Sequence, residues 1–156
     1  MEQFLELFHP NPGNSYLLVT SNIDEVADAL HATITAVEGN FSIALYGQGD
    51  FAGAKVEQID ALHKPFRALP RDNDRVIFKD ILTRHASANM LLKLAYKTLA
   101  NAAEVIIVEK AGELDETATK ELLEANEFRA PNKIEGLLEG YDVFTARKMH
   151  MWGNGL

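Results

Sequence analysis

The sequence has 156 residues and a net charge of −8, with 47% hydrophobic and 24% charged residues. This balance is typical of a globular chain that buries one core, so we expect residues 1–156 to form a single domain. The absence of cysteine excludes disulfides, thiol nucleophiles and cysteine-ligated metal sites. No apolar run is long enough to cross a membrane, and acidic residues stand where a secretory signal carries basic ones, which predicts a cytoplasmic protein.

The negative charge is concentrated in the first half of the chain. Residues 1–78 hold five basic and eleven acidic side chains, a balance of −6, whereas residues 79–156 hold ten and twelve, a balance of −2. Nucleic-acid binding depends largely on lysine and arginine displacing counterions from phosphates. The charge therefore predicts no general binding of DNA or RNA.

Hydrophobic spacing predicts alternating strands and helices in the first half. The apolar run 16–19 is typical of a buried strand. A helix is expected over 23–37, because its apolar residues recur at intervals of three and four, and Asn22 is the candidate N-cap. Residues 41–46 form the next strand. Residues 51–62 are compatible with a helix or, over 55–60, with a strand; we favour the helix, because parallel strands need a long crossover.

The second half continues the same alternation. Strands are predicted over 66–69, 76–78, 105–108 and 141–149, and helices over 88–100, 115–125 and, as a short turn, 134–138. Alternating strands and helices indicate an α/β fold, a three-layer open sheet that is mostly parallel with helices on both faces. The last strand is expected to be antiparallel and to lie at the edge of the sheet.

Open α/β sheets bind ligands beyond the carboxyl ends of their strands, which predicts a small-molecule site at that edge. The polar residues that follow predicted strands are Thr20, Ser21, Asn22, Gly47, Gly49, Asp50, Arg71, Lys79 and Asp80, with His85 one turn further on. Structural roles compete with binding at several of these positions: a cap for Asn22 and a buried structural role for His85. We interpret Glu109 as part of a solvated loop. The five histidines have no paired spacing, so no metal site is predicted.

Residues 47–53, GQGDFAG, follow a strand and precede the favoured helix. This is the context of a phosphate-binding turn, but the spacing is one residue longer than the dinucleotide fingerprint. The competing interpretation is a tight turn in which Gly47 and Gly49 supply backbone freedom.

Residues 65–82, PFRALPRDNDRVIFKDIL, resemble the segment of class I S-adenosylmethionine-dependent methyltransferases in which a Leu-Pro turn leads into the fourth strand. The strand 104–109 and the terminal strand 141–148 are also similar to that family. The resemblance implies a methyltransferase-like fold with S-adenosylmethionine as cofactor. It places Lys79 and Asp80 where the family has substrate residues.

The remaining site residues follow from that resemblance. Cofactor-binding positions fall on Ser21, Asn22, Gly47, Gly49 and Asp50. Substrate-binding positions fall on Lys79 and Arg71, and Asp80 or His85 would act as proton acceptor or orienting group near the methyl acceptor.

The first turn departs from the family pattern. It reads Thr20-Ser21-Asn22, whereas the family has a glycine-rich turn that lets the backbone approach the methionine part of the cofactor. A β-carbon there blocks close approach. In addition, Tyr46-Gly47 stands where the family tends to have an acid for the ribose hydroxyls.

Three hypotheses follow. The protein is a methyltransferase with an unusual cofactor pocket, or a catalytically inactive methyltransferase-like domain that serves as a binding or scaffold protein. In the second case a homodimer or a protein partner is expected, and the tail around Trp152 either contacts that partner or packs on the sheet edge. The third hypothesis is binding of a small anion or nucleotide by Arg67, Arg71 and Lys79. If Ser21 and Asn22 fill the space above the first strand, the first hypothesis weakens.

Overall fold

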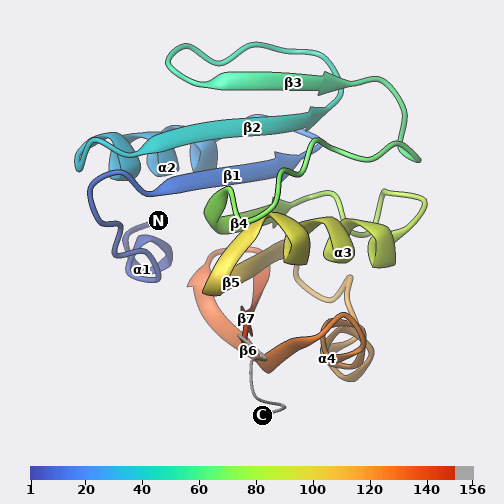
Figure 1. The fold of residues 1–156 in the computed structure, drawn as a ribbon. Helices are drawn as coiled ribbons and strands as arrows, with labels where there is room; N and C mark the ends of the chain where they lie inside the picture. The colour runs from blue at the N-terminus through green and yellow to red at the C-terminus, as the bar shows by residue number, and fades with distance from the viewer. Residues whose placement is uncertain (150–156) are drawn as a thin grey trace.

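The computed structural model describes residues 1–149, which build one seven-stranded sheet with helices on both faces (Figure 1). The strands are β1 (Ser15–Thr20), β2 (Asn40–Tyr46), β3 (Lys55–Ile59), β4 (Asn73–Lys79), β5 (Leu99–Lys110), β6 (Phe128–Leu138) and β7 (Tyr141–Lys148). The helices are α1 (Glu2–Leu5), α2 (Glu25–Thr35), α3 (Ala88–Thr98) and α4 (Glu116–Ala125). The predicted three-layer α/β fold is confirmed. The predicted contact of Trp152 lies outside the described residues.

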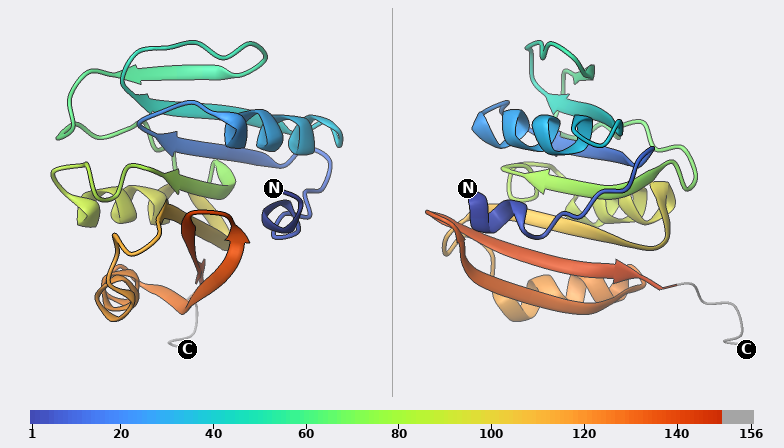
Figure 2. Two further views of the ribbon diagram at one scale, coloured as in Figure 1. Left: turned by 180° about the vertical axis from the view of Figure 1, so that it is seen from behind. Right: turned by 90° about the vertical axis from the view of Figure 1, so that its left-hand side faces the viewer.

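Two hydrophobic cores lie on opposite faces of the sheet. On one face, α1 and α2 pack on strand residues such as Leu18 and Ile77. On the other face, α3 and α4 pack on Phe78 and Ile107 (Figure 2). Successive residues of a strand point to opposite faces, and both faces are covered at the centre of the sheet. The central strands are therefore continuous apolar runs rather than alternating ones.

The order of strands is β3-β2-β1-β4-β5-β7-β6. β1 to β5 are parallel, whereas β7 runs antiparallel to β5 and to β6. The order reverses between β1 and β4, where Thr20 pairs in register with Lys79. The predicted antiparallel C-terminal strand is confirmed, but β6 rather than β7 occupies the edge. The switch point between β1 and β4 is where such sheets bind ligands.

The prediction of a helix over 51–62 is wrong. Lys55–Ile59 form β3, which is parallel to β2, and only the loop 47–54 connects the two strands. Phe51 of this loop packs on the α2 side of the sheet, with its ring centroid 5.3 Å from that of His31 and 5.9 Å from that of Phe41. These aromatic contacts hold the connection against the α2 side of the sheet without a helix.

Two other predicted elements are also wrong. Residues 66–69 form no strand; Phe66 and Ala68 lie in the loop 60–72 and point into the core on the α3 face. Residues 134–138 are not helical, because they belong to β6 and pair with β7. Apart from Leu69, the apolar residues of both segments are partly or fully buried as expected, but hydrogen bonding in the tertiary structure decides the backbone conformation.

Candidate functional site

The turn after β1 is closed by its own side chains. The Thr20 hydroxyl donates to the carbonyl oxygen of Asn22 at 3.0 Å and accepts from the N–H of Asn22 at 3.1 Å. The Ser21 hydroxyl donates to the backbone carbonyl of Asp80 at the end of β4. A hydrogen bond therefore bridges the two strand ends at the switch point, and the Asn22 side chain is exposed.

A buried cation lies directly beside this bridge. The Nζ atom of Lys79 donates to Asp24 Oδ2 at 2.7 Å, to Asp80 Oδ2, and to the Tyr141 hydroxyl at 3.2 Å. The Lys79 side chain is 1% exposed. We call these four residues, Asp24, Lys79, Asp80 and Tyr141, the Lys79 cluster. It links α2, β4 and β7 on the α2 face of the switch point.

The electrostatics of the Lys79 cluster keep the lysine charged. Burial by itself would lower the pKa of Lys79, but the hydrogen bonds with Asp24, Asp80 and Tyr141 outweigh it and raise that pKa above its ordinary value. Asp24 has a second role, because its Oδ1 atom accepts from the N–H of Val26 at 3.0 Å and caps α2. The prediction of Asn22 as the cap is therefore wrong: the helix begins at Glu25, two residues later than expected.

Glu109 organises the segment that follows β4. Its carboxylate accepts from the N–H groups of Ile81 and Leu82 at 2.9 and 3.0 Å and from the Thr83 hydroxyl at 3.0 Å. Burial raises the pKa of Glu109, although these three hydrogen bonds oppose the rise. The interpretation of Glu109 as part of a solvated loop is wrong, because the residue is 1% exposed and anchors this segment.

His85 is buried with both ring nitrogens occupied. Its Nδ1 atom accepts from the N–H of Ser87 at 2.8 Å, and its Nε2 atom lies 3.0 Å from the carbonyl oxygen of Lys64. This pattern defines a neutral tautomer protonated on Nε2. The ring packs edge-on against Tyr46, with centroids 5.2 Å apart. His85 thus ties loop 60–72 to the segment before α3, and neither nitrogen is free to move a proton.

The carboxyl ends of β2 and β3 are open, in contrast with the switch point. Two cavities of about 360 and 390 Å³ lie there, and Gly47, Gln48, Ile59 and Asp60 line both. Gly47 approaches the first turn, since a β-carbon on it would lie 3.7 Å from the carbonyl oxygen of Ser21.

Other predicted residues of this turn lie near these cavities without lining them. The carbonyl of Gly49 accepts from Gln58 Nε2 at 2.7 Å, and Asp50 is exposed. Neither residue is among those that line the two cavities.

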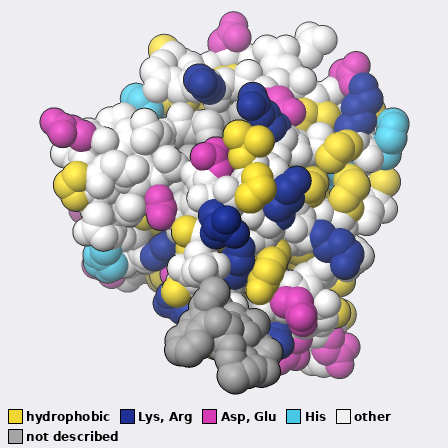
Figure 3. All heavy atoms as spheres, viewed as in Figure 1, with side chains coloured by type: hydrophobic (Ala, Val, Ile, Leu, Met, Phe, Trp, Pro, Cys, Tyr) yellow, Lys and Arg dark blue, Asp and Glu magenta, His cyan; other side chains and the backbone are white. Residues whose placement is uncertain are grey.

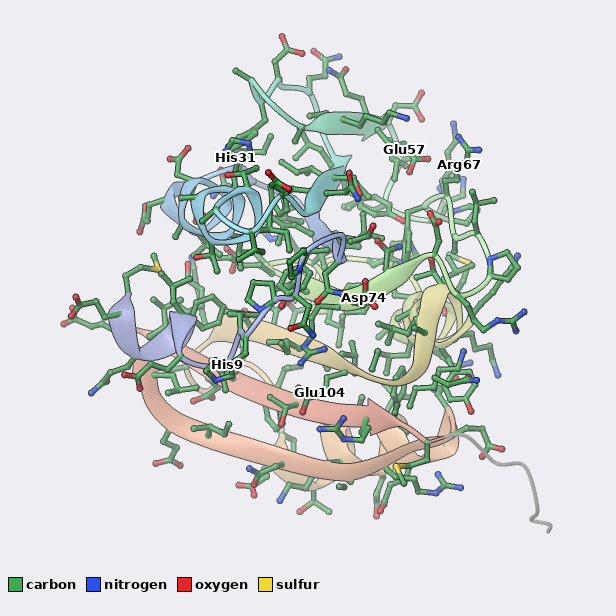
Figure 4. All side chains as sticks on the ribbon, turned by 60° about the vertical axis from the view of Figure 1, so that its left-hand side comes forward. His9, His31, Glu57, Arg67, Asp74 and Glu104 are labelled. Atoms are coloured by element: carbon green, nitrogen blue, oxygen red, sulfur yellow. The ribbon has the colours of Figure 1, made fainter. Side chains whose placement is uncertain are left out.

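The three cations of the anion-binding hypothesis do not converge. Lys79 is buried at the carboxyl end of β4, whereas Arg71 precedes the same strand and donates its N–H to the carbonyl of Lys97 at the opposite edge of the sheet. Arg67 is exposed on loop 60–72 and lies beside Glu57 of β3 (Figure 4). Since Arg71 follows no strand, its expected position at the carboxyl edge is wrong.

Three residues of the site were not predicted from the sequence. Asp24 could have been predicted as the N-cap of the helix, because aspartate is as good an N-cap as asparagine. Glu109 ends the most apolar strand, and an acid in that position is buried only if it has partners, which spacing does not reveal. Tyr141 enters the site because β7 runs antiparallel beside β5, a consequence of sheet order alone.

Comparisons with known proteins give a likeness in structure but not in sequence. No protein-family model matches the sequence, and no curated protein matches it. Among solved structures, a SAM-dependent methyltransferase from Aquifex aeolicus superimposes with a TM-score of 0.74 at 13% identity, covering 95% of this chain and 89% of that one.

Two further structures extend the likeness. A putative methyltransferase in complex with the Haloferax volcanii Trm112 methyltransferase activator gives a TM-score of 0.76 at 8% identity, with 96% of this chain and 88% of that one covered. The CurJ carbon methyltransferase gives a TM-score of 0.73 at 13% identity. The match covers 94% of this chain but only 51% of the CurJ chain. The chain has a class I methyltransferase-like fold.

The switch point does not fit the cofactor that this fold implies. A glycine-rich turn would leave space for S-adenosylmethionine above β1, whereas Thr20, Ser21 and Asn22 all carry β-carbons. The Ser21 hydroxyl spans the gap to Asp80, and the Lys79 cluster fills the space beside it. The open cavities lie one strand away, at the ends of β2 and β3.

Within residues 1–149, no group of three or more histidine or acidic side chains has the geometry to hold a metal ion. No helix in that range is long and apolar enough to span a membrane.

Proposed function

We propose that this chain is a non-catalytic methyltransferase-like domain that acts by binding. The observation that carries the proposal is the hydrogen bond from Ser21 to the carbonyl of Asp80, which closes the crevice between β1 and β4. To admit the methionine part of S-adenosylmethionine, the protein would have to break this bond and move a backbone turn that the Thr20 hydroxyl also holds. Buried polar groups that lose their partners are costly.

The candidate catalytic residues also favour a structural role. The carboxylate of Asp80 is paired with the buried ammonium of Lys79, and the ring nitrogens of His85 are both hydrogen-bonded. A general base needs a free lone pair directed at the substrate. His85 has none in this arrangement, and the carboxylate of Asp80 is held in an ion pair with Lys79.

The proposed ligand site is the pair of open cavities. Asp60, Gln48 and Gln58 line the space at the ends of β2 and β3 with carboxylate and amide groups, next to the apolar side chain of Ile59. Such a mixture suits a small polar molecule with an apolar face. A nucleoside has this chemistry, so adenosine is a suitable probe.

A second candidate function is methyl transfer with S-adenosylmethionine bound. The observation that favours it is the same pair of cavities, because they lie at the carboxyl edge where the cofactor of the similar structures would be sought. In that case the adenosine part would occupy the ends of β2 and β3, and the turn after β1 would open on binding.

Isothermal titration calorimetry with S-adenosylmethionine, S-adenosylhomocysteine and adenosine separates the two functions. We expect no binding of either cofactor form at millimolar ligand. Micromolar affinity for S-adenosylmethionine would refute the non-catalytic assignment. The variant Ser21→Gly with Asn22→Gly restores a flexible turn without the Ser21 hydroxyl, and Ser21→Ala with Asn22→Ala is its matched control. Both variants lose the Ser21 hydroxyl and its bond to Asp80, but only the glycine pair also loses the β-carbons. If the closed turn excludes the cofactor, the alanine pair should gain some affinity and the glycine pair should gain more.

A further inference from the structure

At the end of the sheet opposite β6, the described residues place neither a strand nor a helix beyond β3, and the loop 47–54 passes above this strand in Figure 1. β3 is the first strand in the sheet order, and within residues 1–149 no strand pairs with its outer edge. The connections on either side of it, 47–54 and 60–72, contain no helix. In Figure 1, β3 lies at the top of the sheet with neither face covered by a helix. The outer edge of β3 therefore has no strand partner among residues 1–149, which is the condition under which an edge can pair with another chain.

A groove runs beside this strand on the α3 face. It has a volume of about 650 Å³, and Leu17 and Leu69 supply apolar side chains to its lining. Leu69 is 45% exposed, which is high for a leucine. Lys55, Glu57, Arg67 and Asp72 surround the groove with two positive and two negative charges. Figure 3 shows basic, acidic and hydrophobic side chains intermingled on this face, and Figure 4 shows Glu57 and Arg67 next to one another.

The two edges of the sheet differ in regularity, and this difference indicates which edge can pair with another chain. At the β6 edge, the pairing with β7 has two register shifts, Ala130 and Gly136 have φ angles of 53° and 79°, and Pro131 removes a donor. Such irregularity protects an edge from pairing with another chain. β3 pairs with β2 in unbroken register from Lys55 to Ile59 and has neither bulge nor proline.

We infer that the β3 edge binds a second copy of this chain, with the two β3 strands antiparallel across a twofold axis at Val56. In this register Lys55 of each copy lies directly opposite Glu57 of the other, on the same face of the sheet. Oppositely charged pairs in that position stabilise an antiparallel pair. A register centred on Glu57 would oppose two glutamates, and one centred on Lys55 would oppose two lysines.

The equal numbers of positive and negative charges around the groove also favour a second copy of this chain as the partner. A twofold interface brings each patch against an identical patch, so the patch has to be complementary to itself. Lys55 and Arg67 with Glu57 and Asp72 meet this condition, whereas the chain as a whole carries −8. The apolar groove adds contact area that an isolated strand pair lacks.

Sedimentation velocity over a range of protein concentrations tests the inference. We expect a species of twice the 17.3 kDa chain mass. Lys55→Glu and Glu57→Lys each place like charges opposite one another, so each should weaken dimerisation by about tenfold or more. The double variant restores two opposite-charge pairs and should recover the dimer. Circular dichroism melting of each variant identifies any that fail to fold.

The absence of cysteine provides a second, geometric test. Val56→Cys places two thiols directly opposite at the axis, within the distance that a disulfide spans, so oxidation should give a covalent dimer. Gln58→Cys is the matched control on the same face of the strand. Its two thiols would lie roughly 13 Å apart along the strands, too far for a bridge.

Three results would overturn the inference. They are a monomer up to millimolar concentration, a dimer that the single charge reversals leave unchanged, and equal oxidative cross-linking of the Val56→Cys and Gln58→Cys variants. None of these measurements involves S-adenosylmethionine, and the β3 edge is separate from the Ser21–Asp80 bridge. Failure of this inference is therefore distinct from failure of the proposed function.

Discussion

At the scale of single residues, two buried ionisable groups dominate the carboxyl edge. Lys79 forms ion pairs with Asp24 and Asp80, and Glu109 accepts hydrogen bonds that hold the segment after β4. Both side chains are 1% exposed. Buried charges persist only when they are paired or fully hydrogen-bonded. Their contacts therefore stabilise the carboxyl edge of the sheet.

Replacing Lys79 should destabilise the protein strongly. Lys79→Met keeps the length of the side chain but leaves Asp24 and Asp80 without their buried cation, and we expect a loss of about 3 to 5 kcal/mol in the free energy of unfolding. Urea denaturation measures this loss. Lys64→Met is the control, because Lys64 pairs with Asp60 in an exposed ion pair and should cost at most about 1 kcal/mol. Equal costs for the two variants would contradict the structure.

The raised pKa of Glu109 predicts a pH dependence with a definite sign. Between the model-compound pKa of about 4.5 and the higher folded-state pKa, the folded state binds the proton and the unfolded state does not. The contribution of Glu109 to stability is therefore fully present below pH 4.5 and is lost as the pH rises through the folded-state pKa. Glu109→Gln should remove that slope, which denaturation of both proteins across this pH range measures. A parallel pH profile for the two proteins would refute the assignment.

At the scale of elements, the β2–β3 connection shows how a short loop replaces a crossover helix. Loop 47–54 is anchored by Phe51 against His31 and Phe41. Gly53 lies under the imidazole of His31, where a β-carbon would be 2.8 Å from Nε2, and its φ angle is +91°. The loop therefore depends on a glycine for both backbone conformation and close packing.

Gly53→Ala tests this arrangement. We expect a loss of more than about 1 kcal/mol, because the new methyl group meets His31 in a backbone conformation that alanine disfavours. Gly13→Ala is the matched control, since Gly13 has a similar φ of +85° but no atom within 4 Å of its β-carbon position. In thermal unfolding, Gly53→Ala should have a lower melting temperature than Gly13→Ala. The reverse order would exclude the packing of His31 on this loop.

At the scale of the whole molecule, charge and sheet order have separate consequences. The net charge of −8 acts on any partner at long range, whereas the sheet order leaves one regular edge, β3, and one irregular edge, β6. Binding of a nucleic acid requires a basic surface that this chain lacks overall. Association of two copies through β3 needs only a locally balanced patch.

The charge leads to a prediction for nucleic acids. Fluorescence anisotropy of a labelled DNA duplex should show no binding at low salt, where electrostatic attraction is strongest. Binding that weakens steeply as salt is added would reveal a basic surface large enough to override the net charge. A basic protein of similar mass serves as the positive control for the assay.

Much of the fold could be predicted because hydrophobic spacing reports burial. The strands at 16–19, 76–78 and 105–108 and the helix at 88–100 agree with β1, β4, β5 and α3 to within a few residues, apart from the extension of β5. The helix predictions for residues 51–62 and 134–138 were wrong because short apolar spacings fit helix and strand equally well. Hydrogen bonds with β2 and with β7, formed between distant parts of the chain, decided them.

For the site, the sequence by itself determined that Ser21, Asn22, Lys79 and Asp80 follow strands and that no glycine-rich turn follows β1. These are properties of local order along the chain. Only the tertiary structure decided that the Ser21 hydroxyl reaches the carbonyl of Asp80 and that Lys79 is buried between two carboxylates. The physical reason is that Ser21 is 59 positions from Asp80 and Asp24 is 55 positions from Lys79. These residues become neighbours because β1 and β4 pair at the point where the strand order reverses.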